Sequence, residues 1–557
     1  MHYLNQILST IDSYLGSSQW FPLLLIGTGI FFTIYLKFPQ FRFFRHALKV
    51  VSGKFDKEED KGDTSHFQAL TTALSGTVGT GNIAGVALAI FIGGPAALFW
   101  MLLTAFLGMT TKFVEVTLSH KYREVDDKGF ISGGPMYYMK NGLNMKWMAG
   151  FFAAMTILTS FGVGNFPQIN SISNSLFSTF GINKMLVGGI LAIILAAVVL
   201  GGIKRIAKVT ERLVPSMALI YFIGAISVLC YNYENVIPSL ISVFSNVFTG
   251  TSAFGGFLGA GFSFALTKGV NRGLFSNEAG AGSAPIAHAA ARTKEPVSEG
   301  MVAILEPFID TIVICTLTGL VILSSGVWKE KLPNKFQPTD TIFMASQYSD
   351  DNPKDVEKLF HFLSGETTLP LFNGELLVEN GMIQNKLSII NARSLAENVK
   401  VYDSNNNLYS GIIPIQNGEN KSTKGLYFKG NSLVHSAPLT AVAFTRSWFG
   451  SAGSWIVSIG LVLFAFSTSI AWAYYGGRSI TYLFGTKGLL AYRLIYCASF
   501  FVASFTDTTI VWVISAITMT LMSVPNLIGL LMLRKDMRNT VNEYVVKFRD
   551  EHPSGKL

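Results

Sequence analysis

Residues 75–85 read Ser-Gly-Thr-Val-Gly-Thr-Gly-Asn-Ile-Ala-Gly and interrupt an apolar run that covers residues 67–92. A second interruption, residues 273–282, reads Gly-Leu-Phe-Ser-Asn-Glu-Ala-Gly-Ala-Gly and falls inside the apolar run 253–291. In hydrocarbon every backbone polar group needs a partner, so an unwound segment is stable only where it lines a buried cavity. Paired interruptions in two halves of a chain are typical of inverted-repeat transporters. For either segment alone, the alternative is close helix packing over small residues.

The composition is that of a membrane protein. Of 557 residues, 50% are hydrophobic and only 14% are charged, and the mean hydropathy is +0.40. A soluble globular protein carries roughly 25% charged residues. These values exclude a disordered chain, a fibrous chain and an ordinary cytosolic enzyme. The net charge of +9 lies mainly in short loops between apolar runs, which is typical of cytoplasmic loops and does not indicate nucleic-acid binding.

Eleven apolar runs are near the ~20 residues that a helix needs to cross a bilayer. They are residues 19–36, 67–92, 94–119, 147–171, 184–203, 212–232, 253–291, 299–326, 454–484, 488–505 and 508–532. Lys and Arg are concentrated in alternate loops, which predicts a cytoplasmic C-terminus and an outside N-terminus. Residues 1–19 contain no Lys or Arg and so lack the basic start of a signal peptide.

Residues 329–440 differ from the rest of the chain because they are polar and rich in turn signals. The stretch Asp403–Asn407 lies between two β-favouring segments, which predicts a hairpin. We expect a small β-rich domain outside the membrane, and a disordered loop is the alternative. The predicted organisation is 1–36 N-terminal extra helix, 37–66 cytoplasmic linker, 67–232 first five-helix repeat, 253–328 start of the second repeat, 329–440 insertion, 454–532 end of the second repeat and 533–557 cytoplasmic tail.

An ion channel is the alternative function. The run Thr77–Gly81 is similar to the carbonyl-lined filter of potassium channels. Such a filter needs four loops around one axis, and this chain carries one. No Gly-Lys-Ser or Gly-Lys-Thr follows the glycines, so the run is not a phosphate loop. Transport would then be driven by an ion gradient, and a membrane enzyme is disfavoured because no nucleophile, base and orienting residue form a recognisable set.

Several segments together resemble the alanine/glycine:cation symporter family. They are Thr72–Gly85, Gly133–Tyr138, Gly164-Asn165 with Gln168, Asn271–Ala290 and Phe464–Gly476. The resemblance covers nearly the whole chain except residues 329–440. It implies an all-α polytopic protein with a leucine-transporter-type inverted repeat of 5+5 helices and one extra N-terminal helix. It also implies symport of alanine or glycine with sodium by alternating access, and no enzymatic activity.

The resemblance assigns the substrate to the two glycine-interrupted segments. Backbone amides near Gly79, Thr80 and Gly81 would face the substrate carboxylate, because half-helix N-termini attract anions. The other expected substrate-binding residues are Asn165, Gln168, Phe275, Ser276 and Trp472. The large ring of Trp472 would limit the cavity to a small amino acid. The alternatives are interhelical hydrogen bonding for the two amides and packing for the tryptophan.

Sodium is a hard cation that prefers oxygen ligands. Ser467 and Thr468 could supply two hydroxyls, although a hydroxyl that bonds back to its own helix is the commoner arrangement. The full expected sodium set is Ser75, Val78, Asn82, Phe464, Ser467 and Thr468. The intramembrane carboxylates are functional candidates by default. Glu115 is interpreted as a structural ion pair with Lys112 and His120, whereas the roles of Glu278, Glu306 and Asp310 stay open.

Overall fold

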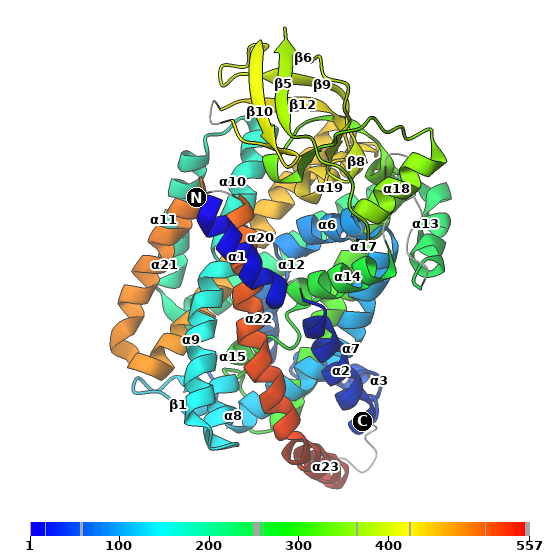
Figure 1. Ribbon diagram of the computed structural model, residues 1–557. Helices are drawn as coiled ribbons and strands as arrows, with labels where there is room; N and C mark the ends of the chain where they lie inside the picture. Colours follow the sequence, from blue (N-terminus) through cyan, green and yellow to red (C-terminus); the bar gives the residue numbers. More distant parts are fainter. Residues whose placement is uncertain are drawn as a thin grey trace.

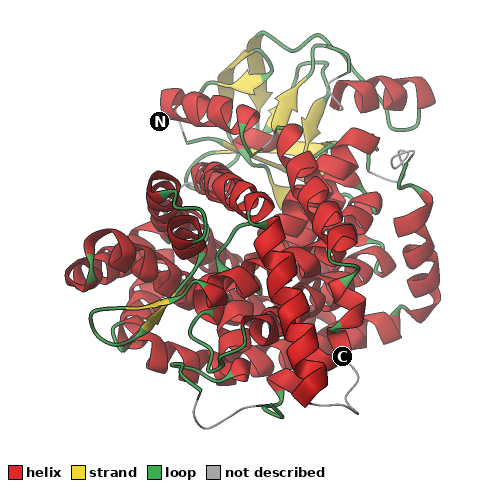
Figure 2. Cartoon of the chain, turned by 90° about the horizontal axis from the view of Figure 1, so that it is seen from below, coloured by secondary structure: helices red, strands yellow, loops and turns green. Residues whose placement is uncertain are grey.

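The structure is a computed structural model that describes residues 2–16, 18–55, 60–248, 257–259, 261–363, 366–422, 425–506 and 508–551. Parts of the predicted segments 1–36, 37–66, 253–291, 329–440 and 533–557 therefore lie outside the described residues. Helices form the body of the molecule, and most of the strands gather at one end of it, opposite the C-terminal helix (Figure 1). Seen from below, helices fill most of the near face and the larger sheet lies behind them (Figure 2).

The first half of the chain is helical apart from one short hairpin. Its helices are α1 (His2–Tyr14), α2 (Trp20–Tyr35), α3 (Pro39–Arg42), α4 (Phe44–Val51), α5 (His66–Thr77), η1 (Gly81–Gly85), α6 (Val86–Gly93), α7 (Ala96–Lys121), α8 (Pro135–Asn141), α9 (Lys146–Gly162), α10 (Phe166–Phe180), α11 (Lys184–Val199), α12 (Gly202–Tyr231) and α13 (Tyr233–Ser245). The hairpin joins β1 (Glu124–Val125) to β2 (Ile131–Ser132).

The second half contains the remaining helices. They are α14 (Phe262–Asn277), α15 (Ala284–His288), α16 (Pro296–Pro307), η2 (Phe308–Cys315), α17 (Thr316–Ser324), η3 (Val327–Lys329), η4 (Pro338–Asp340), α18 (Pro353–Leu363), α19 (Ser436–Thr445), η5 (Gly450–Ala452), α20 (Gly453–Phe484), η6 (Thr486–Gly488), α21 (Leu489–Ala503), α22 (Thr508–Met532) and α23 (Arg534–Glu551). Two of the helical segments, η1 in the first half and η2 in the second, are π-helical and lie inside longer helical runs. Such π-helical segments occur frequently at functional sites.

The expected all-α fold of about eleven spans, with a leucine-transporter-type 5+5 repeat and an extra helix, is wrong on two counts. Among the described residues, six helices are long and apolar enough to cross a membrane, or seven if the bent pair α5 and η1–α6 is one span. The apolar runs 19–36, 184–203, 253–291 and 488–505 contain helices of only 16, 16, 16 and 15 residues. Apolar residues continue past the helix ends into turns, so run length overestimates helix length. The predicted orientation used that span count and stays a prediction.

The second count concerns the strands, because the chain is not all-α. A seven-stranded antiparallel sheet has the order β11-β10-β5-β6-β9-β12-β3, and β4, β7 and β8 form a smaller sheet. The strands are β3 (Leu332–Lys335), β4 (Thr341–Phe343), β5 (Gly374–Glu379), β6 (Met382–Ile383), β7 (Ile389–Asn391), β8 (Ser394–Leu395), β9 (Glu397–Tyr402), β10 (Gly411–Gln416), β11 (Glu419–Asn420) and β12 (Tyr427–Ser432). We call this unit the β domain.

Alternation of apolar and polar residues explains why this stretch forms a sheet. In β10, Ile413 and Ile415 are buried while Ile412 is exposed, as the two-residue period of a strand requires. The buried residues pack with Phe343, Leu376 and Phe428 in a core separate from that of the helices. The β domain contacts the rest of the chain at Ala392, which clusters with Phe91 of α6, and at Arg393, whose Nη2 donates a hydrogen bond to the Gly259 carbonyl at 3.0 Å.

Candidate functional site

The first break lies between α5 and η1. Helix α5 starts at a capping box in which Ser65 and Gln68 exchange side-chain and backbone hydrogen bonds. After Thr77 the chain bends by 51° before it continues through η1 and α6. In the turn, the Gly79 N–H donates to Asn82 Oδ1 at 2.8 Å. A Cβ on Gly79 would collide with Thr468 Oγ1 of α20, so glycine lets α20 approach the broken backbone.

The second break is built differently. Helix α14 stops at Asn277, and Glu278 adopts a left-handed conformation with φ 53°. Gly280 and Gly282 follow with φ of 94° and 83°, conformations that residues with a side chain rarely adopt. The chain then enters the short helix α15. This segment is a terminated helix with a connecting loop, whereas the first break is a bend within a helical run.

Asp310 on η2 joins the two breaks. Asn82 of η1 donates from Nδ2 to Asp310 Oδ1 at 2.7 Å, and Ser276 of α14 donates from Oγ to Oδ2 at 2.7 Å. Thr311 donates to the same Oδ2 at 2.6 Å, and all four side chains are buried. Sequence reasoning left the role of Asp310 open, and the available signal was its position as a carboxylate inside an apolar helix.

The structure brings five of the six predicted sodium residues together. Ser467 Oγ lies 2.8 Å from the Phe464 carbonyl and 3.3 Å from the Ser75 carbonyl. Thr468 Oγ1 lies 3.1 Å from the same Phe464 oxygen and 3.4 Å from the Val78 carbonyl. Both hydroxyls thus bond back to their own helix and also face the first break. The sixth residue, Asn82, contacts the Asp310 cluster instead. A set of neutral hard oxygens fits a monovalent cation, and its assignment to sodium stays a prediction.

The predicted substrate residues divide into two groups. Gln168 contacts the first break, because the Thr80 N–H donates to its Oε1 at 3.3 Å. Gly81 also lies in this group, since a Cβ on it would lie 3.3 Å from the Phe275 ring and 3.2 Å from Ser276 Cα. Gln168, Gly81, Phe275 and Ser276 therefore lie together beside the first break.

Asn165 and Trp472 are held by other neighbours. Asn165 donates from Nδ2 to the Tyr496 carbonyl at 2.8 Å, so it contacts α21 and does not share the contacts of Gln168. The Trp472 Nε1–H donates to Glu278 Oε1 at 2.9 Å, and its Cβ lies directly against Gly164. Trp472 is therefore anchored to the second break.

The ion pair expected between Glu115 and Lys112 is not formed directly, because Lys112 pairs with Glu306 and Glu115 accepts from Asn526.

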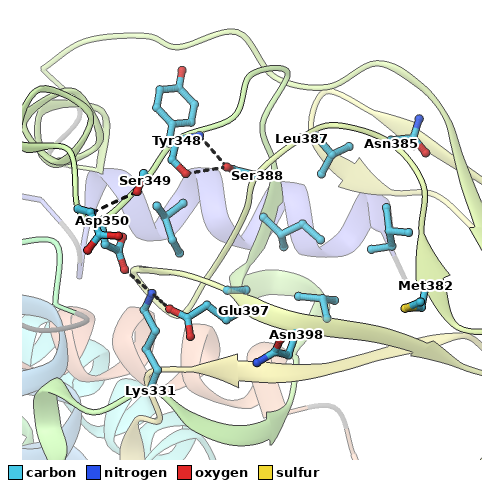
Figure 3. Close-up of a pocket in the computed structure, with 16 residues that line it drawn as sticks. Lys331, Tyr348, Ser349, Asp350, Met382, Asn385, Leu387, Ser388, Glu397 and Asn398 are labelled. Carbon is cyan, nitrogen blue, oxygen red and sulfur yellow. Dashed lines mark hydrogen bonds and ion pairs between the residues drawn. The ribbon is translucent and has the colours of Figure 1, made fainter.

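A cavity of about 700 Å³ lies in the β domain and not between the helix breaks (Figure 3). Lys331 pairs there with Asp350 and, at 2.6 Å, with Glu397 Oε1, and its side chain is only 11% exposed. Burial alone would lower the pKa of the Lys331 ammonium, but hydrogen bonds to the two carboxylates outweigh burial and raise it. The charge of Lys331 is thus already paired within the chain.

Comparison with known proteins gives a consistent result. A family model described as the sodium:alanine symporter family matches residues 1–347 and 422–555, which leaves most of the β domain unmatched. A sodium/alanine symporter, AgcS, from Methanococcus maripaludis is 36% identical over 534 residues, 95% of this chain and 94% of that protein. An uncharacterized transporter from Haemophilus influenzae is 34% identical over 99% of this chain and 98% of its own length. A probable sodium/glutamine symporter, GlnT, from Bacillus subtilis is 41% identical over 58% of this chain and 67% of its own length.

Proposed function

The chain belongs to the sodium:alanine symporter family, and we propose that it carries alanine and glycine together with sodium by alternating access. Membership of this family makes it a transporter and not an enzyme. Its apolar helices make it a multi-pass membrane protein. We place it in a bacterial inner membrane, with the N-terminus and the β domain outside and the C-terminus in the cytoplasm.

The convergence of both breaks on Asp310 is the observation that carries the proposal. A buried carboxylate at membrane depth is costly unless it is paired or serves a ligand. Here Asn82 comes from one break and Ser276 from the other, and each donates one hydrogen bond to Asp310. Neutral donors reduce the cost of the charge but leave it uncompensated. A cation beside this site would compensate it.

In the proposed mechanism the substrate carboxylate faces the amides of Gly79, Thr80 and Gly81. The sodium ion is carried as a second substrate by Thr468 and the oxygens gathered around it. Gln168 already contacts the Thr80 amide, so an incoming carboxylate would exchange with its side-chain oxygen. Trp472 sets the size limit of the cavity. Both ligands bind at the first break, which explains how binding of one favours binding of the other.

The relatives bear on the choice of substrate. AgcS is named for alanine and GlnT for glutamine, so the family accommodates side chains of different sizes. A tryptophan held by Glu278 on the cavity wall favours the smaller group, because a large fixed ring leaves little room beyond a methyl group. We therefore propose alanine and glycine as the substrates.

Uptake of radiolabelled alanine into proteoliposomes tests this function. We expect uptake to need an inward sodium gradient, to fail when potassium replaces sodium, and to stop when an ionophore collapses the gradient. Excess unlabelled glycine should compete. Sodium flux that proceeds without alanine would instead support the channel alternative at Thr77–Gly81, and alanine uptake without sodium would contradict the coupling.

A further inference from the structure

A line of buried titratable groups runs from the start of α5 along α16 to Lys112 of α7. Glu299 of α16 contacts His66 through one carboxylate oxygen and His288 through the other. The next pair is His288 with Glu306, and Glu306 Oε1 in turn accepts from Lys112 Nζ at 2.9 Å. Every one of these side chains is at most 3% exposed. We call His66, Glu299, His288, Glu306 and Lys112 the buried relay.

Charge balance favours protonated imidazoles in this region. Glu115 and Glu278 also act electrostatically on Lys112, and Arg123 acts on Glu299, so four carboxylates face two fixed cations and two imidazoles. If all four carboxylates are ionised, this group is neutral only when both imidazoles carry a second proton. Uncompensated charge in a buried site costs several kcal/mol, so charge balance favours a proton on His288 Nε2.

One gap in the relay is suited to hold a proton. His288 Nε2 lies 3.8 Å from Glu306 Oε2, beyond the distance of a hydrogen bond, and neither atom has a hydrogen-bond partner among the described residues. The other nitrogen, Nδ1, contacts Glu299, so Nε2 is the position left for a second proton. A proton on Nε2 would convert the gap into a charge-assisted hydrogen bond and draw α15 toward α16.

The gap is linked to the transport site by both helices. Glu306 precedes Asp310 by one helical turn in the run α16–η2, and His288 ends α15, which follows the second break. At the other end of the relay, His66 begins α5 and thus the first broken helix. Any change in the gap therefore acts on segments that carry the proposed ligand site.

Other titratable groups face this region, and most of them have hydrogen bonds outside the relay, although the Tyr475 hydroxyl has none among the described residues. Glu278 accepts from Trp472 and Ser283, and Glu115 accepts from Asn526. The remaining neighbours are His120, Arg123, Tyr138, Tyr475 and Asp310. His120 contacts the Ala291 carbonyl through Nε2, and Arg123 donates to the Ala289 and Ala291 carbonyls.

We propose that the gap between His288 Nε2 and Glu306 Oε2 is a proton-binding site whose proton is released when sodium binds. The inference rests on the proposed function for its place in the transport cycle. The proton comes from water, binds to Nε2 and makes an imidazolium; on release it returns to water and no other bond changes. The sign follows from electrostatics, since sodium at the first break adds positive charge to a segment whose Asn82 donates to Asp310, one helical turn after Glu306. Linkage is reciprocal, so a lower pH weakens sodium binding by up to about tenfold per pH unit.

Proton release from purified protein in weakly buffered detergent solution, followed with a pH-indicator dye, tests this site. We expect sodium chloride, but not potassium chloride, to release protons, with a pH midpoint set by the titration of one imidazole. His288→Gln should release none and should bind sodium with an affinity that no longer depends on pH. His435→Gln is the matched control, because that imidazole pairs with Asp340 in the β domain and should leave the release unchanged.

The outcomes separate this inference from the proposed function. Protein that releases protons on addition of sodium but never binds alanine would contradict the symport proposal and leave the proton site standing. Alanine binding that needs sodium but releases no proton in the wild type would overturn the proton site. Release that persists in His288→Gln, or that disappears in His120→Gln instead, would also overturn it. If His288→Gln does not fold, Glu306→Asp is the second variant, because it keeps the charge and widens the gap. It should shift the pH midpoint of proton release. An unshifted midpoint would overturn the proton site.

Discussion

The two glycine-rich segments look alike in the sequence but differ in the structure. The first is a bend of 51° followed by the π-helical turn η1 within one helical run. The second is the end of α14, followed by a loop in which Glu278, Gly280 and Gly282 adopt left-handed conformations. In the first segment, Gly79 has no side chain and therefore lets Thr468 of α20 approach closely. In the second segment, glycine is needed because the backbone has a positive φ. The same residue type therefore marks two different physical requirements.

This difference assigns different roles to the two segments. The first presents its backbone to Thr468 and Gln168, both predicted ligand residues. The second contributes side chains, with Ser276 on Asp310 and Glu278 on Trp472. We therefore expect added bulk on the backbone to reduce alanine uptake most at the first break. At the second break, we expect side-chain substitutions to change the sodium dependence and the selectivity of uptake.

Gly79→Ala should have the largest effect. The added methyl group would collide with Thr468 Oγ1 and lie 3.3 Å from Gln168 Oε1. Overpacking of a tight buried site costs ~1–3 kcal/mol, which corresponds to roughly 5- to 150-fold lower uptake of alanine. Gly85→Ala is the control in the same segment, because its nearest neighbour would be the Thr80 carbonyl at 4.0 Å, an ordinary contact. Equal uptake by both variants would refute the close-approach role of Gly79.

Asp310→Asn should have the next largest effect, because it removes the charge that joins the breaks. The asparagine would also turn one donor toward Asn82 or Ser276, which donate to Asp310 in the structure. We expect the sodium concentration for half-maximal alanine uptake to rise about tenfold, which corresponds to ~1.4 kcal/mol. Thr311→Val removes one of the three donors and keeps the charge, so its effect should be smaller. The reverse order of the two variants would contradict a role for the charge.

Trp472→Ala should change selectivity more than rate. The indole is buried and donates to Glu278, so its removal opens space beside the second break. Each additional methylene accommodated is worth only ~1–3 kcal/mol of discrimination. We expect weaker alanine uptake and new inhibition by amino acids the size of leucine or methionine, measured by competition on protein of confirmed fold. Trp448→Ala, at an exposed site, should keep the wild-type inhibitor profile; the same profile in Trp472→Ala would show that this ring does not line the pocket.

Replacement of residues 335–432 with a Gly/Ser linker should have the smallest effect. Most of this stretch lies outside the part that matches the family model, and its sheet has a core of its own, although Ala392 also packs with Phe91 of α6. The cavity around Lys331 is within the β domain, away from both breaks. We expect sodium-coupled uptake to stay within about twofold of the wild type, since closing a long surface loop differently costs little. Loss of uptake in a well-folded deletion would assign the β domain a part in transport.

Sequence reasoning located the breaks but not their form. Glycines and polar residues within apolar runs can be recognised from residue type alone, so Gly79, Gln168 and Ser467 could be singled out. The helix lengths could not be read, because apolar residues such as those of 184–203 continue beyond the helix that ends at Val199. The all-α label did not fit the whole chain, although a β-rich insertion was expected in residues 329–440, where Ile412 and Ile413 alternate between exposed and buried positions. The partner of Asp310 could not be found from spacing, because Asn82 and Ser276 are distant in the chain and meet only in three dimensions.

The sodium dependence of alanine binding to purified protein tests the central claim most directly, namely that α20 and the first break together hold the cation. Calorimetric titration with alanine over a range of sodium concentrations, at constant ionic strength, should be compared between the wild type and Ser467→Ala/Thr468→Ala. Ser469→Ala is the control, since its hydroxyl donates at 3.1 Å to Ala465 on its own helix. We predict that the double variant needs at least about tenfold more sodium for half-maximal alanine affinity, while the control matches the wild type. An unchanged sodium requirement in the double variant would contradict the account.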